Sequence, residues 1–373
     1  MSPRTLVFSL VSITVLATCR LSLACTQIQV MAKDGSPVIA RTMEFAPNLA
    51  SHISTSPAGK VFQSPSPDGN NGLQWTSKYG YVLIDSFGQK RVIDGMNTEG
   101  LSMGWLYLPE YAEYPKVPSG MENSALNYLF VGDWVLGNFT TVDQVKKAIG
   151  DVHVYGSEES FGPFKDVIFP LHLIVTDASG KSLVVEWVAG KVKVYDNAPG
   201  ILTNSPEFSW QLINLKNYMN MTPYAPSPVV ISGVEYSAVG QGAGSIGIPG
   251  DFSPPSRFVK MSFLVKNALP VDTADEAVVL AGHIINNADI PKGAVRGAQG
   301  GEDEGVESTQ WTVFKDLKNR ELYYKSYDNM TMQVIDLKKL DFSKGAPQLS
   351  MPIESKQIRI DATDRFKKSI SKK

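Results

Sequence analysis

The chain has 373 residues, of which 43% are hydrophobic and 10% aromatic, a composition typical of a globular protein with one large core or two smaller ones. It contains 35 Lys and Arg residues against 37 Asp and Glu residues. No Lys/Arg-rich stretch is interleaved with aromatic residues, so the charge pattern does not favour a nucleic acid as a partner.

The first 24 residues have the pattern of a secretory signal peptide. Arg4 precedes an apolar run over residues 6–17, and Ser22-Leu-Ala24 is a small-x-small cleavage site. The apolar run is shorter than the roughly 20 residues that a membrane helix needs, so we expect cleavage rather than a membrane anchor. Loss of Arg4 and Arg20 would leave 33 basic and 37 acidic residues, a formal charge of −4 on an exported chain.

Cleavage after Ala24 would also decide what the cysteines can do. Cys19 would leave with the signal, so Cys25 would be the single remaining thiol and no internal disulfide could form. Cys25 would then be the first residue, with a thiol and a free α-amino group on one carbon. Because such an amine titrates at about 7.7 to 8.0, it can act as the base for the sulfur nucleophile without a histidine.

Two alternatives stay open for Cys25. Its sulfur could be acylated and anchor a lipoprotein whose body is a binding module, although Ser22 stands where such a site expects Leu or a similar apolar residue. It could also pair in space with a histidine. The four histidines are His52, His153, His172 and His283. None of them lies three or four residues from another or from Cys25, so metal-ligand spacing is absent and we predict no cofactor.

Residues 25–32 and 38–45 alternate around Asp34-Gly35 and predict a β-hairpin that begins at Cys25. The stretch 47–72 is rich in Ser, Pro, Asn and Gly and predicts a long functional loop. A meander of three short strands is expected next, at residues 79–86, 91–96 and 101–108.

Later segments alternate between helix blocks and strand blocks. Helical spacing predicts helices at 123–136, 141–149, 207–219, 257–268 and 274–287. Strands are expected at 171–176, 182–188, 191–195, 201–203, 309–315, 321–327 and 332–337. Because strands and helices come in groups rather than singly, the pattern favours antiparallel sheets covered by helices over a parallel fold. We expect one α+β domain over residues 25–340, followed by a polar, basic tail over 341–373.

Several separated motifs resemble those of the choloylglycine hydrolase family, which groups conjugated bile salt hydrolases with penicillin V acylases among the N-terminal nucleophile hydrolases. In chain order these motifs are Cys25-Thr26, Arg41-Thr-Met-Glu44, Asp94-Gly-Met-Asn97-Thr-Glu-Gly-Leu101, Leu202-Thr-Asn204-Ser-Pro206, Ser256-Arg257-Phe258 and Thr309-Gln-Trp-Thr312. Together with the export signal, Trp75-Thr-Ser-Lys-Tyr-Gly80 resembles the Gram-negative branch, whose members are periplasmic.

The resemblance implies a four-layer αββα sandwich, often a homotetramer, that hydrolyses linear amides. It implies that Cys25 is both nucleophile and base, that Arg41 lies beside the sulfur, and that Arg257 lies near the active site. Glu44 stands where the family usually has an Asp oriented toward the α-amino group. Asn97 and Asn204 match the positions that donate to the tetrahedral oxyanion.

The expected partner is therefore a small-molecule amide with an apolar acyl group, with no nucleic acid and no stable membrane anchor. Candidate substrates are conjugated bile salts, penicillin V and N-acyl homoserine lactones. We expect four aromatic residues to contribute to an acyl pocket. These are Phe45, Trp75, Trp105 and Tyr107.

Overall fold

The predicted hairpin at Cys25 is the first element of the fold. In the computed structural model, which describes residues 24–297 and 305–368, β1 (Cys25–Met31) pairs antiparallel with β2 (Pro37–Phe45). Gly35 supplies the turn with its φ of +80°, and the Ser36 amide donates a hydrogen bond to the Asp34 carboxylate. The register sets Cys25 opposite Met43.

The hairpin forms one side of a five-stranded antiparallel sheet in the order β1-β2-β18-β19-β20. Its other strands are β18 (Ser308–Asp316), β19 (Glu321–Ser326) and β20 (Asn329–Asp336). All nine residues of β2 are buried, because this strand has neighbours on both sides and layers above and below it. The sheet therefore carries its most protected strand next to Cys25.

A second sheet of eight strands faces the first, in the order β15-β14-β13-β8-β7-β6-β3-β21. Its strands are β3 (His52–Ser56), β6 (Tyr81–Ile84), β7 (Asp94–Asn97), β8 (Ser102–Tyr107), β13 (Leu171–Thr176), β14 (Ser182–Val188), β15 (Lys191–Asp196) and β21 (Ser350–Pro352). The pairs in both sheets are antiparallel, as the block pattern of the sequence predicts.

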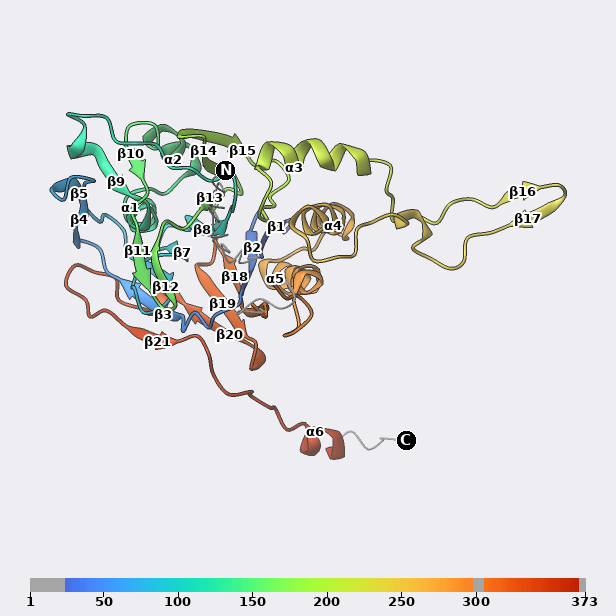
Figure 1. Cartoon of the computed structure of the whole chain (residues 1–373). Helices are drawn as coiled ribbons and strands as arrows, with labels where there is room; N and C mark the ends of the chain where they lie inside the picture. The colour runs from blue at the N-terminus through green and yellow to red at the C-terminus, as the bar shows by residue number, and fades with distance from the viewer. Residues whose placement is uncertain (1–23, 298–304, 369–373) are drawn as a thin grey trace, which may run out of the picture.

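Helices cover the outer faces of the two sheets (Figure 1). On one side, α5 (Ala274–Ile285) packs on β1 and β2, and α4 (Pro254–Asn267) packs on β1. On the other side, α1 (Val131–Asn138) packs on β7 and β8, and α2 (Val142–Ala148) packs on β14. The predicted αββα sandwich is confirmed. α3 (Phe208–Leu215) lies beside α4, and α6 (Thr363–Lys368) ends the described chain.

Local sequence signals explain where these helices begin. Thr273 and Glu276 form the expected capping box at the start of α5. Pro254 and Pro255 occupy the first turn of α4, where a missing N–H costs no helical hydrogen bond. Thr141 caps α2 by accepting a hydrogen bond from the Gln144 amide.

The stretch 47–72 is not the long loop that its composition predicts. It contains β3 and most of a ribbon formed by β4 (Val61–Pro65) and β5 (Asn71–Thr76). Ile53, Phe62 and Trp75 are buried and anchor these strands. The period-2 pattern is hard to see in the sequence because each strand is short and its other face is polar.

Two other predicted elements differ from the structure. The helix expected at 123–136 is replaced in its first half by short 3-10 turns and β9 (Ala125–Asn127), which pairs in parallel with β10 (His153–Tyr155). The strand expected at 201–203 is a single bridge between Gln27 and Leu202. A further ribbon, β11 (Glu159–Phe161) with β12 (Phe164–Val167), was not predicted.

The folded part extends past residue 340, where the sequence placed a domain boundary. β21 adds an edge strand beside β3, and Ile353 is 1% exposed. The sequence pattern did not predict β21, because a three-residue strand among polar residues shows no clear alternation of apolar and polar side chains. Residues 359–368 are exposed, as expected of a polar tail.

One hairpin projects from the rest of the molecule (Figure 1). It consists of β16 (Val229–Ile231) and β17 (Val234–Tyr236), which we call the projecting hairpin. Every residue of both strands is exposed, although most of them are apolar.

Candidate active site

Cys25 lies at the wall of an apolar pocket between the two sheets. Its side chain shares a face of the first sheet with Met43 and Arg41, because directly paired residues and alternate residues of a strand point to the same side. The pocket holds about 600 Å³ of space, part of it open to solvent. It is lined by Cys25, Met43, Phe45, Leu49, Ser86, Phe87, Ile93, Trp105, Tyr107, Leu129, Phe161, Phe169 and Leu171.

Aromatic rings form the far side of this pocket. Phe45 and Phe87 meet edge to face with ring centroids 6.3 Å apart, and Phe161 stacks on Phe169 at 5.0 Å. Of the four aromatic residues expected there, Phe45, Trp105 and Tyr107 line the pocket. Trp75 does not, since it stacks on Phe62 at 5.2 Å in the β4–β5 ribbon. The pocket suits an apolar acyl group.

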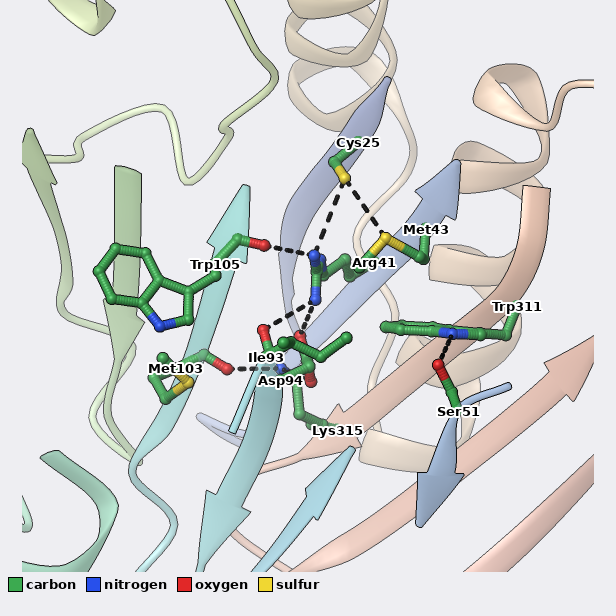
Figure 2. Close-up of polar contacts among 10 residues, drawn as sticks. All are labelled: Cys25, Arg41, Met43, Ser51, Ile93, Asp94, Met103, Trp105, Trp311 and Lys315. Carbon is green, nitrogen blue, oxygen red and sulfur yellow. Dashed lines mark hydrogen bonds and ion pairs between the residues drawn. The ribbon is translucent and has the colours of Figure 1, made fainter. Parts of the chain in front are cut away.

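Arg41 reaches the sulfur from β2. Its Nη2 lies 3.8 Å from Cys25 Sγ and also donates to the Trp105 carbonyl oxygen, while its Nη1 donates to Asp94 Oδ2 at 3.0 Å (Figure 2). The guanidinium is fully buried and lies 5.3 Å from the centre of the Trp311 ring. The resemblance placed Arg41 beside the sulfur, and the geometry agrees.

Asn204 and Arg257 approach Cys25 from its backbone side. The Cys25 nitrogen donates to Asn204 Oδ1 at 2.8 Å, and Arg257 Nη2 donates to the same oxygen at 2.7 Å. Arg257 Nη1 donates to the Cys25 carbonyl oxygen at 2.6 Å and to Thr26 Oγ1 at 2.5 Å. Asn204 Nδ2 gives one hydrogen to the Tyr107 carbonyl oxygen at 2.8 Å, which leaves its second hydrogen for another acceptor.

Glu44 lies one residue from Met43 on β2, so its side chain points to the helix side of the sheet. Its Oε1 accepts a hydrogen bond from Thr309 at 2.6 Å, and its buried Oε2 has no hydrogen-bond partner among the described residues. Its backbone amide donates to the Ala24 carbonyl oxygen at 3.0 Å. Burial raises the pKa of Glu44 to about 7, against the opposing charge of Arg257.

This raised pKa gives stability a pH dependence of definite sign. The folded chain keeps a proton on Glu44 that the unfolded chain releases near pH 4.5, so the contribution of Glu44 to the free energy of unfolding falls as the pH rises through about 7. Glu44→Gln, which stays neutral, is expected to gain about 2.5 kcal/mol relative to wild type between pH 5 and pH 8. Urea unfolding at both pH values measures this change. The exposed Glu158→Gln is the control, and a gain below about 1 kcal/mol would contradict the prediction.

Asn97 does not join this group. Its Nδ2 donates to the carbonyl oxygens of Leu136 and Phe139 at 2.9 and 2.7 Å, and its Oδ1 accepts from the amides of Glu99 and Leu101. Both amide hydrogens are therefore used in holding the end of α1 against the chain after β7, and none is left for an oxyanion. The role expected for Asn97 is corrected to a structural one.

Burial dominates the protonation of the thiol in the chain that retains Ala24. It raises the pKa of Cys25, and Glu44 adds to the increase, while Arg41 and Arg257 oppose it. The Cys25 nitrogen is a peptide amide in this chain. The resting sulfur is therefore a protonated thiol that needs a nearby base before it can act as a nucleophile.

Neither a pairing of Cys25 with a histidine nor a metal site is supported among residues 24–297 and 305–368. His172 bonds Glu186 and the Thr203 carbonyl oxygen, and Cys25 Sγ contacts Met43 and Arg41 rather than a histidine. In the same ranges, no group of three or more His, Cys, Asp or Glu residues is placed to hold a metal ion. The helices in this part of the chain are all too short or too polar to cross a membrane.

Two buried charged residues were missed as part of the site. Asp94 lies inside a motif quoted from the sequence, and Lys315 follows Val313-Phe314 in a strand pattern. A lysine in an apolar strand is a signal that it has a buried partner. The identity of that partner depends on the facing sheet, which the strand pattern does not specify.

The comparisons with known proteins agree with this site. Residues 25–354 match the linear amide C-N hydrolases, choloylglycine hydrolase family. The bile salt hydrolase/transferase of Clostridium perfringens (strain 13 / Type A) is 30% identical over 321 residues, covering 84% of this chain and 93% of that protein. The penicillin V acylase of Pectobacterium atrosepticum is 28% identical over 344 residues, covering 86% and 83%. A crystal structure of a variant conjugated bile acid hydrolase from Clostridium perfringens aligns with a TM-score of 0.77 at 28% identity, covering 90% of this chain and 99% of that one.

The fold, the pocket and these relatives define the class of protein as an amide hydrolase that acts on carbon-nitrogen bonds of small molecules. The match to the family, over residues 25–354, covers most of the chain and includes each of the family motifs quoted from the sequence. The chain belongs to the choloylglycine hydrolase family.

Proposed function

We propose that Cys25, exposed by cleavage after Ala24, is the nucleophile of this hydrolase. The observation that carries the proposal is the position of Cys25, whose sulfur faces an apolar pocket while its nitrogen lies 2.8 Å from Asn204 Oδ1. A free amino group on the same carbon would be held by that oxygen next to the thiol. It would supply the base that the buried sulfur otherwise lacks.

The reaction has two halves. The α-amino group takes the Sγ proton, a bond forms between sulfur and the substrate carbonyl carbon, and the C–N bond breaks as the leaving amine receives that proton. Water then attacks the thioester carbon and gives up a proton to the α-amino group, the C–S bond breaks to release the free acid, and the departing sulfur takes that proton to restore the thiol. The second hydrogen of Asn204 Nδ2 is available to the oxyanion in both halves.

The substrate class follows from the pocket. Rings of Phe45, Phe87 and Trp105 line it, so the acyl side of the amide is the apolar side. The named relatives act on bile salts and on penicillin V. We propose penicillin V, N-acyl homoserine lactones or conjugated bile salts as substrates, and hydrolysis of a panel of all three by the mature protein tests this choice. Release of neither acid nor amine from any of them would reject the proposed class.

We propose that the chain is exported to the periplasm and processed there. Support comes from the signal pattern of residues 1–24 and the cleavage site before Cys25. The runner-up is a lipoprotein or binding module anchored through Cys25 without turnover. Mass spectrometry of the mature N-terminus separates the two, because a free unmodified Cys25 supports the hydrolase and a diacylglyceryl or N-acyl adduct supports the anchor.

The contrast between Asn204 and Asn97 makes the oxyanion assignment testable. Asn204→Ala is expected to lower kcat by about 100-fold to 1,000-fold with a smaller change in KM, as for loss of one oxyanion donor. Asn97→Ala is expected to lower the thermal midpoint of unfolding instead, because it removes four hydrogen bonds to backbone groups, two of them buried and two part-buried. Steady-state kinetics and thermal unfolding of both variants check this. Equal kcat for wild type and Asn204→Ala would reject the role of Asn204.

We also propose that the protein is a homo-oligomer, with a homotetramer expected from the resemblance. The projecting hairpin supports this, since two short strands with exposed Val230, Ile231 and Val234 are marginal in water on their own. Light scattering of the mature protein gives its mass directly. A monomer at all concentrations would reject the proposal.

A further inference from the structure

Lys315 is a fully buried lysine that the proposed mechanism does not use. It lies on β18 with its side chain 0% exposed, and its Nζ donates to Asp94 Oδ1 at 2.6 Å. A buried ammonium is costly unless it is paired, so this contact has to compensate for its desolvation. Lys315 is not among the residues that line the pocket.

Asp94 connects this lysine to the active site. While Oδ1 accepts from Lys315, Oδ2 accepts from Arg41 Nη1 at 3.0 Å, and Arg41 Nη2 lies 3.8 Å from Cys25 Sγ (Figure 2). The four side chains come from β18, β7, β2 and β1, so they join the two sheets. Gly104 leaves the space they need, because a Cβ there would lie 3.0 Å from Asp94 Oδ2.

Counting charges shows what Lys315 contributes. Arg41 and Asp94 alone would neutralise each other, leaving no net positive charge next to the sulfur. With Lys315 the buried group has two cations and one anion, and the thiolate of Cys25 is the second anion that balances it. The charges that act on Cys25 from the helix side are Glu44 on β2 and Arg257 on α4, and these two oppose each other. Glu307 and Asp251 act in turn on Arg257, and Asp289 acts on Glu44.

We propose that Lys315 is a positioning residue for amide hydrolysis: it neutralises Asp94 and so leaves the charge of Arg41 available to the Cys25 thiolate. The inference rests on the proposed role of Cys25 as nucleophile. It assigns to Lys315 an effect on the sulfur through two intervening side chains, without contact with the substrate.

The test measures how the reactivity of the sulfur depends on pH. Cys25 is the single cysteine from residue 25 onward, so iodoacetamide labelling of the mature protein reports on this thiol alone. Lys315→Met is expected to raise the midpoint of the pH–alkylation profile by about one unit and to slow alkylation at pH 7 about tenfold. The value of kcat/KM for the best substrate should fall by a similar factor. The midpoint belongs to the coupled thiol and α-amino group, so the difference between variants is the quantity compared.

Two further variants separate charge from packing. Asp94→Asn removes the anion and is expected to shift the midpoint downward, opposite to Lys315→Met. The double variant Lys315→Met/Asp94→Asn restores one net positive charge and should return the midpoint to within about half a unit of wild type. It also leaves no unpaired carboxylate, so it keeps the test available where Lys315→Met fails to fold. Lys325→Met, a buried lysine on the neighbouring strand that bonds Asn286, is the matched control and should leave the profile unchanged.

Two results would overturn the inference. One is a wild-type midpoint in folded Lys315→Met, and the other is a shift in the same direction for Lys315→Met, Asp94→Asn and the double variant, which would indicate packing alone. A different result would show that the proposed function itself is wrong. In that case Cys25→Ala would retain hydrolysis, whatever effect the Lys315 variants have on alkylation.

Discussion

Cys25→Ala is expected to abolish amide hydrolysis while leaving the fold intact. Without the sulfur no acyl-enzyme can form, and loss of a nucleophile of this kind lowers kcat by at least about 10,000-fold. The fold should tolerate the change, because the polar contacts that Cys25 Sγ makes among the described residues are weak ones, to Met43 Sδ at 3.7 Å and Arg41 Nη2 at 3.8 Å. Hydrolysis of penicillin V and glycocholate, followed as amine release, gives the rate.

The control for this experiment is Met43→Leu. Met43 lies opposite Cys25 in the hairpin and 3.7 Å from its sulfur, so this variant disturbs the same pocket wall without removing the nucleophile. It should keep kcat within about tenfold of wild type, since the two side chains have similar volumes. A Cys25→Ala variant as active as Met43→Leu would show that another group performs the attack.

A chain that begins at Ala24 instead of Cys25 is expected to be at least about 1,000-fold less active. Its Cys25 nitrogen is an amide, which cannot accept the Sγ proton, whereas a free α-amino group with a pKa near 7.7 to 8.0 can. The structure shows that the extra residue fits. Ala24 is 4% exposed, and its carbonyl oxygen accepts a hydrogen bond from Glu44. The loss of activity would therefore be chemical rather than structural.

Two fusions with a cleavable leader make this comparison clean, one releasing a chain that starts at Ala24 and one releasing a chain that starts at Cys25. Mass spectrometry verifies both ends, and thermal unfolding verifies that both are folded. Equal kcat values would exclude the α-amino group as the base. Recovery of activity after the chain is unfolded, trimmed of Ala24 by an aminopeptidase and refolded would support it in the same sample.

Sequence patterns predicted the layers of this fold better than its connections. The β1–β2 hairpin was predicted because Asp34-Gly35 is a strong turn signal between alternating strands, and α5 because Thr273 and Glu276 cap it. β3 and β21 were missed because short strands with a polar face carry little periodicity. Pairing between them joins residues about 300 positions apart, and such contacts leave no local trace.

In the site, too, the residues in the motifs were predicted better than the long-range contacts between them. Cys25, Arg41, Asn204 and Arg257 meet as the resemblance implied, while Asn97 does not. A motif match identified Asn97 as a residue with a fixed role but could not say that the role was to hold the end of α1 against the chain after β7. The contact of Lys315 with Asp94 depends on how two sheets face each other, which strand patterns do not encode.

The burial of Ala24 sets an order of events in maturation. A peptidase has to draw several residues around the scissile bond into its own cleft as an extended strand, and this backbone is already paired through the Ala24 carbonyl oxygen and the Cys25 nitrogen. Once β1 has paired with β2, whose nine residues are all buried, cutting would need local unfolding of this hairpin. Cleavage at the proposed site would therefore have to precede folding, and a precursor that folds first is expected to stay uncut.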